Sequence, residues 1–135
     1  IDYAAGLEAA LKLKELSYIH AEAYAAGELK HGAISLIEEG VPVIGILSQP
    51  ELFEKMRSNM AEVKSRGGCL YALFMGKDRE LLSGTDGSIL LPETEPLFSA
   101  SLSVIPLQLL AYRVSVLRGL DVDRPRNLAK SVTVE

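Results

Sequence analysis

Three charged residues near the N-terminus have the spacing of one helical face. Glu8, Lys12 and Glu15 are four and three positions apart, so a helix would direct their side chains to the same side. Apolar residues flank this stripe, with Ala5, Ala9, Leu13 and Leu16 on one side and Leu7 and Leu11 on the other. The pattern is compatible with a cleft in which a carboxylate and an ammonium are partly desolvated and have shifted pKa values. The alternative is a solvated face with ordinary Glu–Lys pairs, which the spacing alone favours.

His31 is a second candidate for proton transfer. It lies in the segment AAGELKHG (residues 25–32), whose glycines would let the backbone approach a ligand. Histidine exchanges protons near neutral pH. A lone histidine is more often structural or at the surface, so this alternative remains open for His31 and is preferred for His20.

The C-terminal segment, residues 121–135, is polar and has no usable period. A terminal segment of this kind ordinarily frays. The functional alternative is that it folds over a site and presents the amine of Lys130 to a carbonyl carbon as a nucleophile.

The sequence contains no recognisable metal or nucleotide motif. One cysteine and two separated histidines give no zinc or iron spacing, and no glycine-rich phosphate loop is present. We therefore expect no metal and no cofactor. Ser48 and Gln49 follow an apolar run where a helix N-terminus could contact a phosphate, but capping of that helix is the favoured role of Ser48. A net charge of −4 gives no general attraction for nucleic acid.

Helices and short apolar strands alternate along the chain. We expect helices over residues 4–16, 48–67 and 98–118, and strands over residues 42–47, 70–75 and 88–91. Continuous apolar strands are typical of a sheet buried on both faces. The sequence thus predicts an α/β fold, a three-layer, flavodoxin-like or Rossmann-like sandwich with a mainly parallel sheet flanked by helices.

The last helix is the most apolar stretch of the chain. Pro106, Gln108, Arg113 and several serines favour a buried helix over a membrane span. Its apolar stripe consists of Leu102, Ile105, Leu109, Tyr112 and Val116. No basic region followed by an apolar signal core begins the chain, so we expect no membrane association and a cytoplasmic location. Because parallel sheets of this type usually have more than three strands, we also expect a further strand upstream, in a longer chain.

Four segments together resemble a known family. They are LEAALKLKE (7–15), AAGELKHG (25–32), SVIPLQLL (103–110) and RPRNLAKSVTVE (124–135). They resemble glucosamine-6-phosphate synthase, also called glutamine:fructose-6-phosphate amidotransferase. The resemblance implies a sugar isomerase (SIS) fold over residues 1–135, in the second of two SIS halves, with an active-site tail at residues 119–135. It also implies that the family's N-terminal glutaminase domain and first SIS half are absent here.

The resemblance also implies roles for individual residues. Lys130 looks like the lysine that forms a Schiff base with C2 of open-chain fructose 6-phosphate. Glu15 resembles the carboxylate that moves a proton between C1 and C2, with Lys12 placed to assist it. His31 looks like the histidine that helps open the sugar ring and reaches into the neighbouring subunit's site, which implies a homodimer.

Other positions depart from the family pattern or match it more loosely. Glu8, Arg126 and Ala129 match positions near the substrate, which is fructose 6-phosphate or glucosamine 6-phosphate. Ala9 stands where the family usually has glycine. A noncatalytic SIS module that binds a sugar phosphate is the competing hypothesis, and a mainly structural dimerisation unit is a third. A noncatalytic module would not need the lysine and carboxylate pair of an imine mechanism, so Lys130 and Glu15 favour the enzyme.

Overall fold

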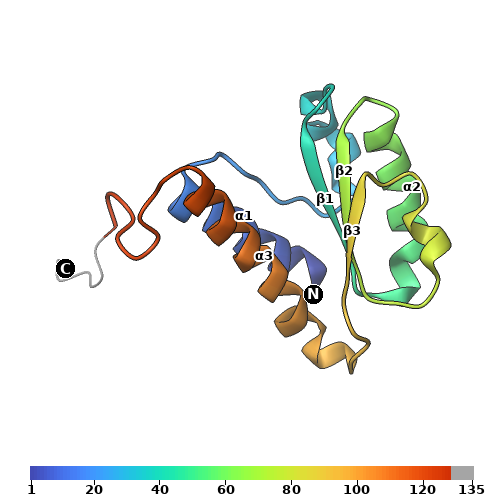
Figure 1. The fold of residues 1–135 in the computed structure, drawn as a ribbon. Helices are drawn as coiled ribbons and strands as arrows, with labels where there is room; N and C mark the ends of the chain where they lie inside the picture. The colour runs from blue at the N-terminus through green and yellow to red at the C-terminus, as the bar shows by residue number, and fades with distance from the viewer. Residues whose placement is uncertain (129–135) are drawn as a thin grey trace.

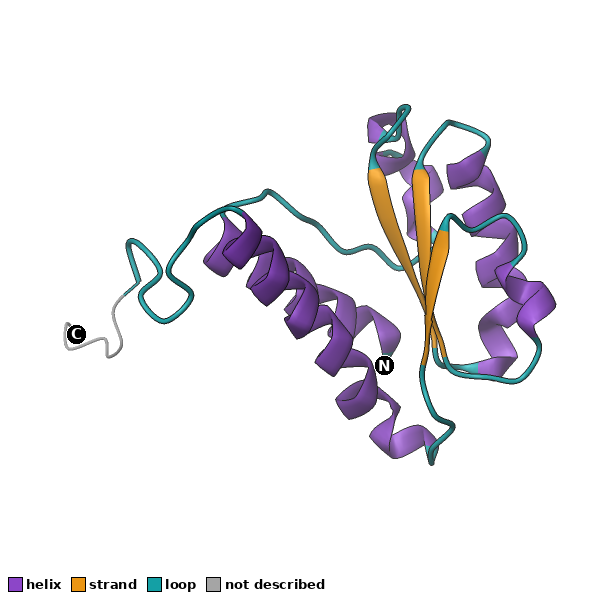
Figure 2. Cartoon of the chain, in the orientation of Figure 1, coloured by secondary structure: helices purple, strands orange, loops and turns teal. Residues whose placement is uncertain are grey.

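The structure, a computed structural model, describes residues 1–128. Its helices and strands follow in this order: α1 (Asp2–Lys12), the π-turn η1 (Leu13–Ser17), the 3₁₀ turns η2 (Glu28–His31) and η3 (Ala33–Leu36), β1 (Pro42–Leu47), η4 (Pro50–Leu52), α2 (Phe53–Lys64), β2 (Cys69–Phe74), η5 (Arg79–Leu82), β3 (Gly87–Leu90), η6 (Pro96–Phe98) and α3 (Ser99–Leu117). Helices lie on both sides of one sheet (Figures 1 and 2). The predicted α/β architecture is confirmed.

The sheet has three parallel strands in the order β1-β2-β3. Pro42 pairs with Cys69 and Leu47 with Phe74, so β1 and β2 run in register over their full lengths. All three strands lie within one residue of the predicted ranges, because a continuous apolar run bounded by glycine and proline leaves little choice of boundary.

One face of the sheet packs against α2. The buried side chains of this core are Leu47, Met60, Val63, Leu70, Ala72, Phe74 and Leu81. Gly45 permits the close approach of the helix, since a Cβ at this position would lie 3.0 Å from Met60 Sδ. Leu29 and Ile37 pack against the same core, which places the η2–η3 segment in the α2 layer.

The opposite face packs against α1 and α3. Ala5 and Ala9 of α1 share a buried cluster with Leu73 of β2 and Leu107 of α3. The buried positions of α3 are spaced four apart: Ser99, Ser103, Leu107, Ala111 and Ser115. Small side chains on both helices let their backbones approach closely, as in other tightly packed helix pairs.

The interpretation of α3 as a buried helix is therefore wrong for its most apolar side. Of the predicted stripe, Ile105, Leu109, Tyr112 and Val116 are 51%, 55%, 44% and 46% exposed. The periodicity was correct but does not say which side of a helix faces the core. The side that is buried carries Leu107 between small residues, and Leu107 packs against Ala5 and Ala9 of α1.

Ser48 does not cap the following helix. Its N–H donates to Asp2 Oδ2 at 3.1 Å, and its hydroxyl donates to Asp2 Oδ1. Asp2 lies in the first turn of α1, so this pair of hydrogen bonds joins the start of α1 to the end of β1. The capping prediction failed because a partner 46 residues away is not visible in the local sequence.

Asp86 links the start of β3 to β2. Its carboxylate accepts hydrogen bonds from Leu70 N–H at 2.6 Å and from Lys64 Nζ at 2.6 Å, and its own N–H donates to Leu70 O at 2.7 Å. The Lys64 hydrogen bond and then the Leu70 N–H hold the pKa of Asp86 below its ordinary value.

The lowered pKa of Asp86 predicts a pH dependence of folding. Its contribution to the free energy of unfolding is present above the ordinary aspartate pKa of about 3.9 and is lost as pH falls through the lowered value. Asp86→Asn should therefore reduce the free energy of unfolding at pH 7 and flatten its decline between about pH 5 and pH 2. Urea denaturation at a series of pH values measures this, with Asp123→Asn in the exposed segment after α3 as the control. An equal acid decline in Asp86→Asn and wild type would contradict the prediction.

Candidate functional site

Helix α1 ends in a π-turn followed by a left-handed residue. Ser17 is fully buried, and its hydroxyl donates a hydrogen bond to Leu13 O at 2.6 Å. A carbonyl group in the last turn of the helix thus accepts from a side chain of the same turn. Tyr18 then adopts φ 57° and ψ 26° and ends the helix. Single π-turns inside α-helices recur at functional sites because they redirect side chains. The candidate Glu15 lies in this turn.

The charged stripe of α1 forms as the spacing predicted. Lys12 Nζ lies 2.7 Å from Glu15 Oε2 and 3.7 Å from Glu8 Oε1. The hydrogen bond to Glu15 raises the pKa of Lys12, partial burial opposes this effect, and the charges of Glu15 and Glu8 add to the increase. Lys12 is consequently an ammonium at neutral pH, and it holds Glu15 in one orientation.

An open hollow of about 480 Å³ lies beside this turn. Its lining comes from two distant parts of the chain: Lys14, Glu15, Tyr18, Ile19 and His20 from the end of α1, and Arg126, Asn127 and Leu128 from the C-terminal segment. The two parts meet because α1 and α3 run in the same direction and end at the same side of the molecule (Figure 1). The structure thus brings Glu15 and Arg126 together.

Tyr18 makes the contact between these two parts. Arg126 N–H donates to the Tyr18 hydroxyl at 2.7 Å, and Arg126 Cζ lies 4.0 Å from the centroid of the Tyr18 ring. The sequence-based interpretation did not single out Tyr18, Lys14 or Asn127. An aromatic residue just after a predicted helix was the available signal, but its left-handed backbone and its partner 108 residues away were not visible.

His31 lies apart from this hollow. The connection after α1 leaves the end of the helix and returns to the sheet (Figure 1), passing Gly6 of α1, where Ala23 Cβ would lie 3.3 Å from an added Cβ. It then enters η2 in the α2 layer, where Lys30 Nζ is 3.7 Å from Glu62 Oε1. His31 is exposed there and is not among the residues that line the hollow.

The remaining candidates are placed as follows. Glu8 contacts Lys12 but does not line the hollow. His20, taken as structural, is 80% exposed and its Nε2 lies 3.5 Å from Glu22 Oε1. Lys130 and Ala129 lie outside the described residues.

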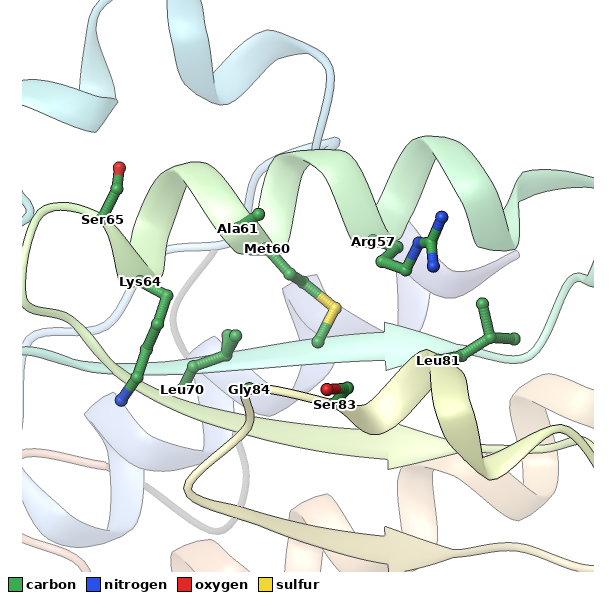
Figure 3. A pocket seen from close by; sticks show the side chains of 9 residues that line it. All are labelled: Arg57, Met60, Ala61, Lys64, Ser65, Leu70, Leu81, Ser83 and Gly84. Atoms are coloured by element: carbon green, nitrogen blue, oxygen red, sulfur yellow. The ribbon is translucent and has the colours of Figure 1, made fainter.

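A second hollow, of about 310 Å³, lies between α2, β2 and η5 (Figure 3). Its two cations already have carboxylate partners, since Arg57 lies 2.8 Å from Glu54 and Lys64 lies 2.6 Å from Asp86. The rest of its lining is mainly apolar, with Met60, Leu70 and Leu81. It offers no group of side chains suited to acid–base or nucleophilic chemistry.

Other ligand chemistries find little support in the described part of the chain. Within residues 1–128 no group of three or more His, Cys, Asp or Glu side chains could hold a metal ion. Ser48, the alternative phosphate contact, has its N–H and hydroxyl directed at the Asp2 carboxylate. A carboxylate at that position would repel a phosphate.

Comparison with known proteins shows similarity to SIS domains and to isomerizing glutamine–fructose-6-phosphate aminotransferases. The SIS domain family model matches residues 1–118. The chain is 56% identical over 135 residues to the glutamine–fructose-6-phosphate aminotransferase (isomerizing) of Symbiobacterium thermophilum, covering 100% of this chain and 22% of that protein. The Escherichia coli protein of the same name is 54% identical over 134 residues, 98% of this chain and 22% of that protein.

A solved structure supports the same relation. The C-terminal domain of glucosamine-fructose-6-phosphate aminotransferase from Francisella tularensis superposes with a TM-score of 0.76 at 43% identity, covering 91% of this chain and 35% of that one. The predicted SIS fold is therefore confirmed. The chain spans about 22% of the length of the curated relatives that it matches.

The Lys12 contacts predict the effect of removing each carboxylate. Glu15→Gln removes the largest cause of the raised pKa of Lys12 and should lower that pKa more than Glu8→Gln does. NMR titration of the Lys12 side chain on the alkaline side measures both shifts. Because the pKa is raised, the stabilisation from this cluster is present below the ordinary lysine pKa and is lost as pH rises through the raised value. An equal effect of the two substitutions would show that the 2.7 Å contact does not persist in solution.

Proposed function

The chain belongs to the SIS domain family, and we propose that it forms the C-terminal SIS half of an isomerizing glutamine–fructose-6-phosphate aminotransferase. This enzyme would convert fructose 6-phosphate and glutamine into glucosamine 6-phosphate and glutamate. The observation that carries the proposal is the hollow in which Glu15 meets the segment that leads to Lys130. In this proposal the chain works in the cytoplasm, as part of a longer protein with a glutaminase domain and a first SIS half.

Lys130 supplies the nucleophile. Its amine adds to C2 of open-chain fructose 6-phosphate and water leaves, which gives an imine. Ammonia released from glutamine then adds to C2, and the lysine amine leaves to give fructosimine. The chain thus returns to its starting state without a cofactor.

Glu15 carries out the isomerisation. Its carboxylate removes a proton from C1 of fructosimine while the imine nitrogen takes up a proton, which gives an enolamine. It then returns a proton to C2 as the C1 hydroxyl loses its proton, which gives the aldehyde of glucosamine 6-phosphate. The Lys12 ammonium, 2.7 Å from Glu15 Oε2, restrains the orientation of the Glu15 carboxylate. Glu8 shares the Lys12 ammonium at 3.7 Å, while Arg126 and Ala129 belong to the segment that covers the substrate.

His31 acts in the site of a second subunit, where it assists ring opening. Its place in the α2 layer, away from the hollow of its own chain, supports this assignment. It requires a homodimer.

Exposed apolar surface supports the presence of further protein around this chain. The stripe Ile105, Leu109, Tyr112 and Val116 on α3 is about half exposed. An 18-residue window of the segment Pro96–Leu117 has a mean hydropathy of 1.5, and 22% of that window is buried. By length and composition it could also cross a membrane, but its small face is packed on α1. Contiguous apolar surface of this kind usually marks a protein interface. We propose that the first SIS half packs against it.

Imine trapping tests the nucleophile. Borohydride reduction with fructose 6-phosphate in the complete enzyme should leave a hexose phosphate on Lys130, identified by peptide mass mapping. Lys130→Arg should abolish the adduct and lower synthesis on the order of a thousandfold or more. Lys77→Arg, at an exposed lysine that pairs with Glu93, is the matched control. Synthesis retained by Lys130→Arg would refute the enzyme proposal and favour a noncatalytic sugar-phosphate module.

Subunit complementation tests the role of His31. Equal amounts of His31→Ala and Lys130→Arg subunits, each inactive alone, should recover about a quarter of wild-type activity when mixed and reassembled, because half of the dimers are mixed and each has one intact site. If His31 and Lys130 of the same chain formed one site, every site in the mixed dimers would lack one of the two groups, and no activity would be recovered. Absence of recovery in confirmed mixed dimers would therefore place His31 in the site of its own chain.

A further inference from the structure

Tyr18 holds the C-terminal segment in two ways at once. Its hydroxyl accepts the Arg126 backbone N–H at 2.7 Å, and its ring lies 4.0 Å from Arg126 Cζ. The first contact fixes the main chain and the second fixes the side chain. A single tyrosine thus restrains both the position and the direction of the chain at residue 126.

Tyr18 has a large side chain at a turn whose backbone conformation suits a smaller residue. Tyrosine rarely adopts a left-handed conformation such as the φ of 57° found here, because its Cβ then lies close to the backbone. Glycine or asparagine would meet the turn at lower cost. The ring and hydroxyl therefore offer something that the turn alone does not require.

The same region of the C-terminal segment has a second left-handed residue. Asn127 adopts φ 62°, directly after the residue that Tyr18 holds. It turns the chain where it lines the hollow next to Glu15. Lys130 is four positions after Arg126 in the sequence, and a main chain of that length spans at most about 14 Å. Restraining residue 126 thus limits where the amine of Lys130 can act.

We propose that Tyr18 is a positioning residue that docks the C-terminal segment beside Glu15 and so sets the approach of the Lys130 amine to the sugar carbonyl. The proposal rests on the proposed function for its catalytic consequence, but the docking itself does not. In this proposal Tyr18 acts through Arg126, whose backbone N–H and guanidinium occupy its hydroxyl and one face of its ring.

The docking is tested first without substrate. Hydrogen exchange of the Arg126 amide in this chain, followed by NMR, should be faster in Tyr18→Phe than in wild type, because phenylalanine keeps the ring and removes the acceptor. Tyr24→Phe is the matched control, since its hydroxyl bonds to Glu22 only two residues away. Unchanged exchange of the Arg126 amide in Tyr18→Phe would overturn the proposal.

The catalytic consequence is tested in the complete enzyme. Tyr18→Phe should lower kcat by up to about fivefold and Tyr18→Ala by about tenfold or more, as one and then both contacts are lost. The KM for fructose 6-phosphate should change little, because in this proposal Tyr18 acts on the C-terminal segment and not on the sugar. A change in KM at constant kcat would overturn the positioning role.

The variant Tyr18→Gly distinguishes the effect of the tyrosine side chain from the effect of the left-handed backbone. Tyr18→Gly keeps the left-handed backbone at low cost, so it should be folded at least as stably as Tyr18→Ala. If the ring positions the segment, both variants lose kcat alike. Wild-type kcat in Tyr18→Gly would show that only the turn matters and would overturn the proposal. Failure of the proposed function would appear separately, as synthesis retained by Lys130→Arg together with the expected exchange result at Arg126.

Discussion

The close packing of α1 against α3 and the sheet determines the geometry of the candidate site. Ala5 and Ala9 meet Leu73 and Leu107 in one buried cluster. Burying the two leucines contributes about 2 kcal/mol each, and the small partners allow the helices to approach closely. Because the two helices run in the same direction, the turn that carries Glu15 and the segment that follows α3 emerge at the same end (Figure 1). A larger residue at Ala9 would move these two parts of the site relative to each other.

The sheet separates two groups of candidate residues. Glu15 and Arg126 lie at the α1–α3 side, whereas His31 lies in the α2 layer with Leu29 packed against that core. The connection from α1 to η2 carries the chain from one side of the sheet to the other (Figure 2). A site that needs both groups is therefore more readily built from two chains than from one, which supports the proposal that His31 acts in a neighbouring subunit.

The charged stripe of α1 combines features of both interpretations that its spacing allowed. Lys12 makes the ion pairs expected of a surface helix, with Glu15 at 2.7 Å and Glu8 at 3.7 Å. Its side chain is nevertheless only 29% exposed, and Glu15 borders the hollow. An ion pair at the edge of a hollow can orient a catalytic carboxylate at little cost, since water still solvates part of it.

Local pattern alone determined much of this protein. The strands β1 (Pro42–Leu47) and β2 (Cys69–Phe74) were predictable to within one residue because apolar runs between glycines and prolines have one favourable arrangement in a parallel sheet. The Glu8–Lys12–Glu15 stripe was predictable because helical spacing is fixed by backbone geometry. Three features depended on partners distant in sequence, so only the tertiary structure decided them. Ser48 bonds to Asp2 instead of its own helix, α3 buries its small face instead of its apolar one, and Tyr18 holds Arg126. Each depends on which surfaces approach one another in the folded chain, and side-chain periodicity does not contain that information.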